Sequence, residues 1–276
     1  MNEPQVFSLT LTSSQKAIDA LQAICPLTRN TLKDAMHKGA VWFQRGKQTQ
    51  RIRRQDRRLH AGDQLFLYYN QQVLTQHCPE AELLADEGEF SVWYKPCGML
   101  SQGSRWSDHC TINRWAETHI QPPRPAFIVN RLDRAAQGLM LISHSKSMAR
   151  ELSRHFEQHS IHKAYIAAVD GKFNEDQVCN FDVNGQSATS HIYALTHSTK
   201  HSLVKIVIET GRKHQIRTHL AALGHPILGD RLFQSGNFNQ DLALACTELS
   251  WQDDAGSNWQ FHLPEQYVPI LPPNNI

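Results

Sequence analysis

The first 70 residues show two helical patterns followed by two strand patterns. Between residues 14 and 39, apolar positions recur every three or four residues in two short sets, which predicts two helices. Pro26 ends the first helix because proline has no backbone N–H to continue it. Gly39 ends the second because glycine readily adopts the left-handed conformation that closes helices. Strands are predicted at residues 40–43 and 64–69, and a polar stretch separates them.

From residue 90 onward, strand patterns alternate with helical ones. An apolar run between Gly138 and Ser143 predicts a short buried strand, and strict alternation over residues 202–209 predicts a half-buried one. The other predicted strands lie at 90–100, 161–171, 242–251 and 259–263. The predicted helices lie at 112–118, at 146–158 and between Gly211 and Gly224.

The composition shifts between these two regions. Residues 71–89 are acidic and contain Pro79 near the middle of the stretch. A change in charge combined with a proline is typical of a linker. We therefore expect a small N-terminal domain at residues 1–72, a linker at 73–89 and a larger domain at 90–276.

Overall composition narrows the class of protein. Hydrophobic residues make up 40% of the 276 residues, which indicates a folded globular chain, and the net charge of +2 excludes a uniformly basic protein. The six cysteines are scattered without a CxxC pair, a pattern typical of free thiols in a reducing compartment. We see no signal peptide and no apolar run long enough to cross a bilayer. A cytoplasmic protein without membrane association is expected.

The polar stretch from Arg45 to Arg58 has seven basic residues and one acidic residue. A charge run is often only a solvated surface, but one of nearly single sign in a balanced chain is typical of sites for anionic backbones. The order of two helices, a strand, this basic run and a closing strand resembles the S4 RNA-binding domain. The resemblance predicts RNA contacts by five arginines of the run: Arg51, Arg53, Arg54, Arg57 and Arg58.

The local sequence pattern does not decide the role of charged residues at two further places in the chain. Asp133 lies between Arg131 and Arg134 at the mouth of the predicted buried strand, where it either caps a turn or takes part in catalysis. Arg212 and Lys213 precede a predicted helix, where positive charge opposes the helix dipole, so a bound anion would account for them. His155, His159 and His162 recur at helical spacing, but no acidic or cysteine partner is evident, and no metal site is predicted.

Three segments in fixed order resemble the RluA-type pseudouridine synthases. They are Asn130-Arg131-Leu132-Asp133-Arg134 with Gly138-Leu139, Lys163-Ala164-Tyr165-Ile166-Ala167, and the stretch from Gly211 to Asp230. Lys95-Pro96-Cys97-Gly98 matches a fourth element of that family. The resemblance implies an α+β fold with a mixed, largely antiparallel sheet and flanking helices, preceded by the small S4-like α/β domain.

The resemblance also implies roles for individual residues. Asp133 corresponds to the essential carboxylate, Tyr165 to the tyrosine that packs on the target base, and Arg217 to the basic partner of the aspartate. Arg131 corresponds to the arginine that enters the RNA stack when the target nucleotide leaves it. We expect further RNA contacts from Arg134, Lys95, Arg212 and Lys213.

The implied reaction is the isomerisation of uridine to pseudouridine in structured RNA, ribosomal or transfer. It breaks the N1–C1′ bond and joins C5 to C1′ without redox change, so no cofactor is expected. A monomer that does not bind DNA is expected. The chain departs from the family at Asn130 and at Ala136-Gln137, beside the catalytic loop. These departures motivate one alternative, a non-catalytic RNA-binding or RNA-folding protein with the same fold. A metal-dependent hydrolase built on the histidines lacks the ligand spacing.

Overall fold

The computed structural model describes residues 3–234 and 240–272, and they form two compact units. The first unit is Met1–Cys78 together with Gln102–Trp115, and the second is Pro79–Ser101 together with Ala116–Ile276. The first unit therefore includes a segment that lies far from it in the sequence. Within the described ranges, no helix is long and apolar enough to cross a membrane.

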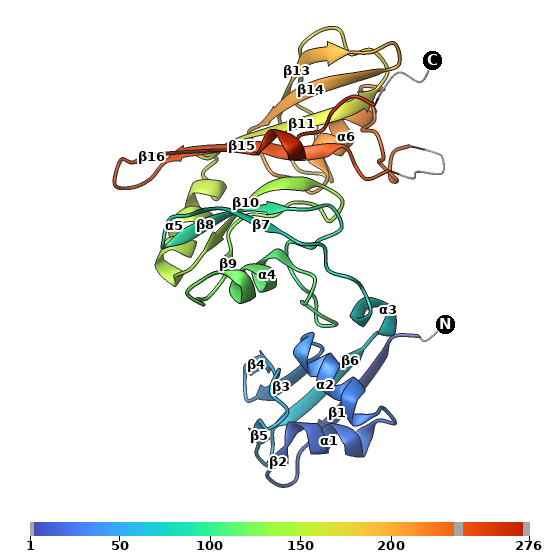
Figure 1. The fold of residues 1–276 in the computed structure, drawn as a ribbon, viewed down its shortest axis with the longest axis vertical. Coiled ribbons are helices and arrows are strands. Elements are labelled where there is room, and N and C mark those ends of the chain that lie inside the picture. Colours follow the sequence, from blue (N-terminus) through green and yellow to red (C-terminus); the bar gives the residue numbers. More distant parts are fainter. Residues whose placement is uncertain (1–2, 235–239, 273–276) are drawn as a thin grey trace. The chain divides into compact units, whose positions relative to one another are not determined.

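The first unit is built on a four-stranded antiparallel sheet with strand order β1-β6-β3-β4. Its strands are β1 (Gln5–Thr10), β6 (Gln64–Tyr69), β3 (Val41–Arg45) and β4 (Gln48–Arg51). Two predicted helices are confirmed as α1 (Ala17–Ile24) and α2 (Arg29–His37), and Figure 1 shows both beside the sheet. A small ribbon of β2 (Gln15–Lys16) with β5 (Arg58–Leu59) and the short α3 (Gln71–Leu74) complete the unit.

The core of this unit lies between the two helices and the sheet. Leu21 of α1 and Leu32 of α2 are fully buried, as is Leu67 of β6. Each such side chain contributes about 2 kcal/mol by leaving water. The Thr28 hydroxyl accepts a hydrogen bond from the Thr31 N–H and caps α2. The apolar spacing seen in the sequence therefore marks the faces that pack together.

Residues 102–115 are tied to the first unit by hydrogen bonds and ion pairs. The Trp42 indole N–H donates to the Arg105 carbonyl at 2.9 Å, and Arg51 stacks on Trp42 with its guanidinium 4.4 Å from the ring centre. Arg51 and Arg53 both form ion pairs with Asp108. The five arginines predicted to contact RNA are thus divided. Arg51 and Arg53 are engaged inside the unit, whereas Arg54, Arg57 and Arg58 are exposed.

The second unit is organised around a ten-stranded sheet, and the α+β fold with a largely antiparallel sheet is confirmed. The strand order is β12-β13-β14-β11-β15-β10-β8-β7, with β16 paired to β15 and β9 paired to β10. The strands are β7 (Glu82–Asp86), β8 (Phe90–Lys95), β9 (Phe127–Ile128), β10 (Gln137–Ser143), β11 (His162–Asp170), β12 (Gln177–Cys179), β13 (Ser190–His197), β14 (His201–Ile208), β15 (Leu244–Gln252) and β16 (Asn258–His262).

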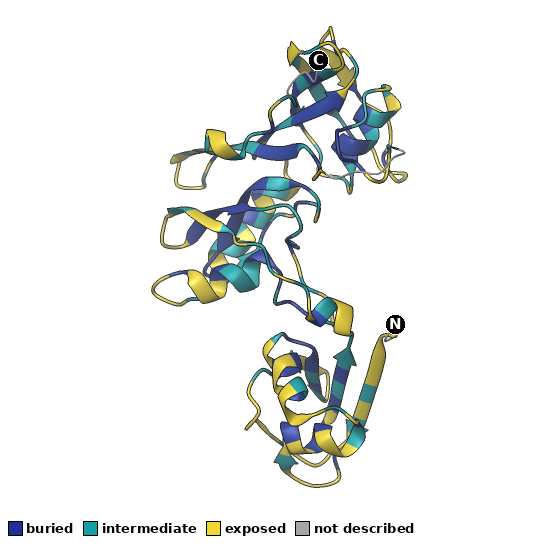
Figure 2. Cartoon of the chain, turned by 45° about the vertical axis from the view of Figure 1, so that its right-hand side comes forward, coloured by how far each residue is buried: buried dark blue, intermediate teal, exposed yellow. Residues whose placement is uncertain are grey.

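Helix α5 (Lys146–Glu157) packs against β10 and β9. The other helices are α6 (Gln215–Ala222), the short 3-10 helix η1 (Glu265–Tyr267) and α4 (Ile112–His119), whose residues are divided between the two units. Figure 2 shows that the central strands are the most buried, and all six residues of β8 are buried. Strand β7 lies within residues 73–89, the predicted linker, and pairs with β8. The sheet of this unit therefore begins before residue 90.

Strand β10 connects the chain's most distinctive loop to the middle of the sheet. It pairs antiparallel with β8 and parallel with β15, where Gln137 faces Ala245 and Gly138 faces Cys246. Gly138 has a φ of 117°, and a Cβ there would lie 2.3 Å from the Cys246 carbonyl oxygen. Only glycine permits this approach of two backbones.

We predict that Gly138→Ala lowers the free energy of unfolding by at least about 2 kcal/mol, because the methyl group collides with backbone and the φ is unfavourable. Gly256→Ala is the matched control: Gly256 also has a positive φ, of 88°, but a Cβ added there would meet nothing within 4 Å. Chemical denaturation of both variants checks the prediction. Equal losses in the two would show that the contact with Cys246 does not matter.

Candidate active site

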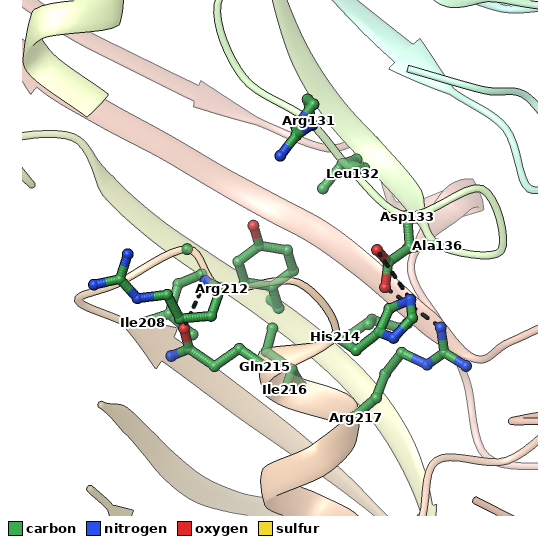
Figure 3. Close-up of a pocket in the computed structure, with 13 residues that line it drawn as sticks. Arg131, Leu132, Asp133, Ala136, Ile208, Arg212, His214, Gln215, Ile216 and Arg217 are labelled. Carbon is green, nitrogen blue, oxygen red and sulfur yellow. Dashed lines mark hydrogen bonds and ion pairs between the residues drawn. The ribbon is translucent and has the colours of Figure 1, made fainter. Parts of the chain in front are cut away.

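A pocket in the second unit collects residues from several parts of the chain. The loop before β10 supplies residues 131–133 and Ala136, β11 supplies Tyr165, and the turn into α6 supplies residues 211–212 and 214–217. The ends of the neighbouring strands β14 and β15 complete the lining. Figure 3 shows their side chains converging on one space. The described residues that line it are Arg131, Leu132, Asp133, Ala136, Tyr165, Ile208, Gly211, Arg212, His214, Gln215, Ile216, Arg217 and Leu244. The structure thus brings together all three residues predicted to be catalytic.

Lys95 holds the loop that carries Asp133. Its side chain is fully buried, and its ammonium group donates hydrogen bonds to the carbonyls of Pro96, Met99 and Ala136 at 2.7–3.0 Å. Burial lowers the pKa of Lys95 to about 8, so the group is still protonated at neutral pH. The prediction that Lys95 contacts RNA is wrong, because a buried ammonium saturated by three carbonyls cannot reach a phosphate.

Asn130 and Gln137, two residues that depart from the family pattern, both form hydrogen bonds through their side chains. The Asn130 side-chain oxygen accepts a hydrogen bond from the Leu141 N–H at 3.2 Å. Tyr94 donates its hydroxyl to the Gln137 side-chain oxygen at 3.0 Å, and the Gln137 amide donates to the Tyr267 carbonyl at 3.1 Å. Asn130 and Gln137 therefore fasten the two ends of the loop. Neither Asn130 nor Gln137 lines the pocket.

Asp133 faces the side chains of Arg217 and His214 at the mouth of the pocket. Its Oδ2 accepts a hydrogen bond from Nη1 of Arg217 at 3.4 Å. Its Oδ1 lies 3.8 Å from Nε2 of His214, too far for a hydrogen bond. About a quarter of the Asp133 side chain is exposed, at 26%, so a substrate can reach it.

Arg217 has a second and closer partner. Its Nε and Nη2 atoms bind both carboxylate oxygens of Asp230, at 2.8 and 2.6 Å, in a two-pronged ion pair that is almost completely buried. This pairing raises the pKa of the Arg217 guanidinium, although burial alone would lower it. The predicted pairing of Arg217 with Asp133 thus rests on an anchor that sequence reasoning missed. Asp230 is the last residue of the third family segment, and that position was the available signal.

Tyr165 lies in the middle of β11 and lines the same pocket. Burial raises its pKa well above the ordinary value, and contact with Cys246 and the charge of Asp133 add to the shift. The phenol is therefore neutral at physiological pH. It can donate a proton or present its aromatic face to a base, but it cannot act as an anionic base.

The residues near the pocket that were predicted to bind RNA differ in their exposure and in whether they line it. Arg131 is exposed and Arg212 is half-buried, and both line the pocket. Arg134 is exposed at an adjoining cavity and donates from Nε to the Gly98 carbonyl at 3.0 Å. Lys213 is exposed but does not belong to the pocket lining. His214, which sequence reasoning did not select, belongs to it.

One group among the described residues has spacing suited to a metal ion. The ligand atoms of Glu151, His155 and Asp254 lie within 4.8 Å of one another. The sequence showed no acidic partner for His155, but α5 places Glu151 one turn before it and the turn between β15 and β16 brings in Asp254. Arg154 already forms an ion pair with Asp254. None of these residues lines the pocket.

Comparison with known proteins agrees with this geometry. The family model described as RNA pseudouridylate synthase matches residues 89–222. The dual-specificity RNA pseudouridine synthase RluA of Escherichia coli is 31% identical over 175 residues, a match that covers 57% of this chain and 78% of that protein. The chain belongs to the RluA-type family of RNA pseudouridine synthases.

Other relatives of this RluA-type synthase act on different RNAs, according to their names. The tRNA pseudouridine synthase C of Yersinia pestis is 34% identical over 197 residues, with 61% of this chain and 77% of that protein covered. The ribosomal large subunit pseudouridine synthase D of Nitrosomonas europaea is 28% identical over 200 residues, which cover 66% of this chain but only 57% of that protein.

The fold of this RluA-type chain is also found among solved structures. Human RNA Pseudouridylate Synthase Domain Containing 4 aligns with a TM-score of 0.56 at 20% identity, over 67% of this chain and 89% of that one. Human RNA Pseudouridylate Synthase Domain Containing 1 aligns with a TM-score of 0.55 at 18% identity. At such low identity the likeness concerns the fold alone.

Proposed function

We propose that this synthase isomerises uridine to pseudouridine in structured RNA, with Asp133 as the reacting carboxylate. The observation that carries the proposal is the pairing of the partly exposed Asp133 carboxylate with Arg217 beside the buried ring of Tyr165. A carboxylate that only capped a turn would not need a guanidinium anchored by a second, buried acid. An arginine held in this way favours the ionised form of its neighbour.

The chemistry requires that ionised form. The reaction breaks the bond between N1 and C1′, turns the detached uracil, joins C5 to C1′, releases the proton from C5 to water and returns a proton from water to N1. Asp133 either attacks C1′ and leaves again, or takes the C2′ proton and returns it. In both routes the carboxylate begins and ends as an anion, so atoms and charges balance without a cofactor.

Tyr165 and Arg131 have complementary roles in the proposal. The aromatic face of Tyr165 holds the uracil after the glycosidic bond has broken, and its neutral hydroxyl is available for proton transfer. A base inside a helix must leave its stack to enter such a pocket, which costs a few kcal/mol. In the proposal Arg131, which is exposed and lines the pocket, fills the vacated space.

The substrate class follows from the relatives' names, and we propose ribosomal or transfer RNA. Mapping of pseudouridines in total RNA, with and without this protein, tests the function and identifies the site. We expect at least one uridine to lose its modification when the protein is absent and to regain it when the chain is restored. Unchanged pseudouridine maps in both fractions would contradict the proposal.

We propose that the first unit is an S4-like RNA-binding domain. Its helix pair against a four-stranded sheet and its exposed arginines support this assignment. Arg57 and Arg54 line a small surface pocket, and the Arg57 guanidinium lies 5.4 Å from the centre of the Phe43 ring. Guanidinium groups held over an aromatic ring remain available to phosphate oxygens. The larger domain then carries the chemistry and the smaller one adds affinity.

Replacing Arg54, Arg57 and Arg58 together by glutamine is predicted to weaken RNA binding and to reduce the slope of log affinity against log salt by about 2–3. The measurement is a filter-binding titration with mixed ribosomal and transfer RNA at several salt concentrations. The double variant Arg29→Gln/Asp19→Asn is the control, because it removes an exposed ion pair outside the basic run and leaves the net charge unchanged. A triple variant with the wild-type slope would mean that these arginines are only a solvated surface.

A further inference from the structure

His214 lines the pocket and faces Oδ1 of Asp133, the carboxylate oxygen that Arg217 does not contact. Its Nε2 atom is 3.8 Å from Oδ1, whereas Arg217 approaches Oδ2 at 3.4 Å. Figure 3 shows the two side chains on the same side of the carboxylate, with dashed lines to both. Each oxygen of Asp133 therefore faces a different nitrogen donor.

The backbone of His214 has an unfavourable conformation. Its φ is 62° and its ψ is 18°, in the left-handed region that residues other than glycine adopt uncommonly, histidine less uncommonly than most. His214 is the N-cap residue of α6, yet its side chain makes no capping hydrogen bond. Glycine or a capping residue would suit this position better for folding. Capping of α6 therefore does not explain why a histidine stands at this position.

The next residue holds this turn in place. Gln215 is buried, and its side-chain oxygen accepts hydrogen bonds from the Thr210 hydroxyl at 2.8 Å and from the Arg212 N–H at 3.0 Å. Its amide nitrogen donates to the Thr189 carbonyl and the Ser190 hydroxyl. Four hydrogen bonds thus constrain the backbone on both sides of His214. Strain that the surroundings maintain in this way is typical of functional positions.

We propose that His214 is a positioning residue for the reaction, which rests on the proposed function of the pocket. Because Arg217 binds only one oxygen of Asp133, the carboxylate can still rotate about the Cβ–Cγ bond. A second donor at Oδ1 fixes its plane, so that one oxygen faces the ribose. The 3.8 Å separation shortens to a hydrogen bond when a nucleotide fills the pocket, because catalytic contacts are often long in the empty site.

The test compares His214→Gly with His159→Gly. His159 has nearly the same backbone, with a φ of 58°, but is exposed and does not line the pocket. Steady-state kinetics use an RNA fragment that the wild type modifies. We expect His214→Gly to lower kcat by about 10- to 100-fold, the effect of misplacing a reacting group by about 1 Å. KM should stay within about twofold, because ground-state binding is not affected.

Two readouts separate positioning from structure. The melting temperature of His214→Gly should be unchanged or higher, because glycine relieves the left-handed strain. His214→Asn, which tolerates this backbone and keeps an N–H donor, should retain more activity than the glycine variant. His159→Gly should keep the wild-type kcat.

The possible failures are distinguishable. If the wild type forms no pseudouridine in any ribosomal or transfer RNA, the proposed function and this inference both fall. If the wild type is active and His214→Gly keeps full kcat, only the inference about His214 falls. Equal loss of kcat in His159→Gly would also overturn it, because relief of backbone strain would then account for the effect.

Discussion

Asp133→Asn abolishes pseudouridine formation and leaves RNA binding almost intact. Asparagine has nearly the same shape as aspartate and still fits between Arg217 and His214. It lacks the negative charge that either attacks C1′ or takes the C2′ proton. We expect single-turnover rates to fall by at least about 10³-fold, because removing a reacting group costs that much or more.

RNA binding should persist in Asp133→Asn for a separate electrostatic reason. Asp133 is an anion in a pocket rimmed by arginines, so its charge opposes the approach of phosphate. Its removal should leave the dissociation constant for RNA unchanged or slightly lower. Parallel binding and single-turnover measurements on the same RNA check both halves. A variant that retains activity, or one that loses affinity and activity in proportion, would remove Asp133 from the chemistry.

Arg217→Met is expected to lose both activity and stability, for two separable reasons. The Asp230 carboxylate is buried and would lose its ion-pair partner, which costs about 3–5 kcal/mol. Asp133 would at the same time lose the guanidinium that favours its ionised form. Chemical denaturation and single-turnover kinetics measure the two losses.

The double variant Arg217→Met/Asp230→Leu separates these causes. Replacing both members of a buried pair by apolar residues of similar volume is often neutral for folding, so most of the stability should return. Activity should not return, because Asp133 still lacks its partner. Arg154→Met/Asp254→Leu is the control, since this pair of the same residue types is exposed to solvent and contributes little to stability. Recovery of activity together with stability would make Arg217 a structural residue only.

The sequence predicted which three residues meet in the pocket, because they lie in recognisable motifs. Asp133, Tyr165 and Arg217 come from three separate segments, and the ten-stranded sheet brings β10 and β11 to the two sides of β15, next to α6. The helices and the long strands were also predictable, because their apolar periodicity reflects which faces pack.

Other side-chain contacts of the structure could not be predicted from the local sequence pattern. Lys95 stands at the end of β8, a strand buried on both faces, so alternation does not show which way the side chain points. Asp230 pairs with Arg217 across a turn, and His214 contacts the loop of Asp133 over a long distance in the sequence. Residues 102–115 are polar and loop-like, and only the folded chain reveals that Asp108 binds two arginines of the basic run.

The division of the basic run changes how the smaller unit is understood. The sequence presented five arginines as one set, but Arg51 and Arg53 are half-buried and form ion pairs with Asp108, whereas the other three are exposed. The exposed remainder, residues 54–58, lies on the connection between β4 and β5. We therefore expect the RNA contact surface of this unit to be smaller than the number of arginines in the basic run indicated.

The release of hydrogen from C5 of uridine tests the central claim most directly, because the proposed reaction cannot occur without it. RNA labelled with tritium at C5 of uridine, taken from cells that lack the protein, is incubated with the wild type and with Asp133→Asn. The account predicts one tritium released to water per pseudouridine formed by the wild type, and none above background with Asp133→Asn. Release that persists undiminished in Asp133→Asn, or no release from any such RNA with the wild type, would contradict it.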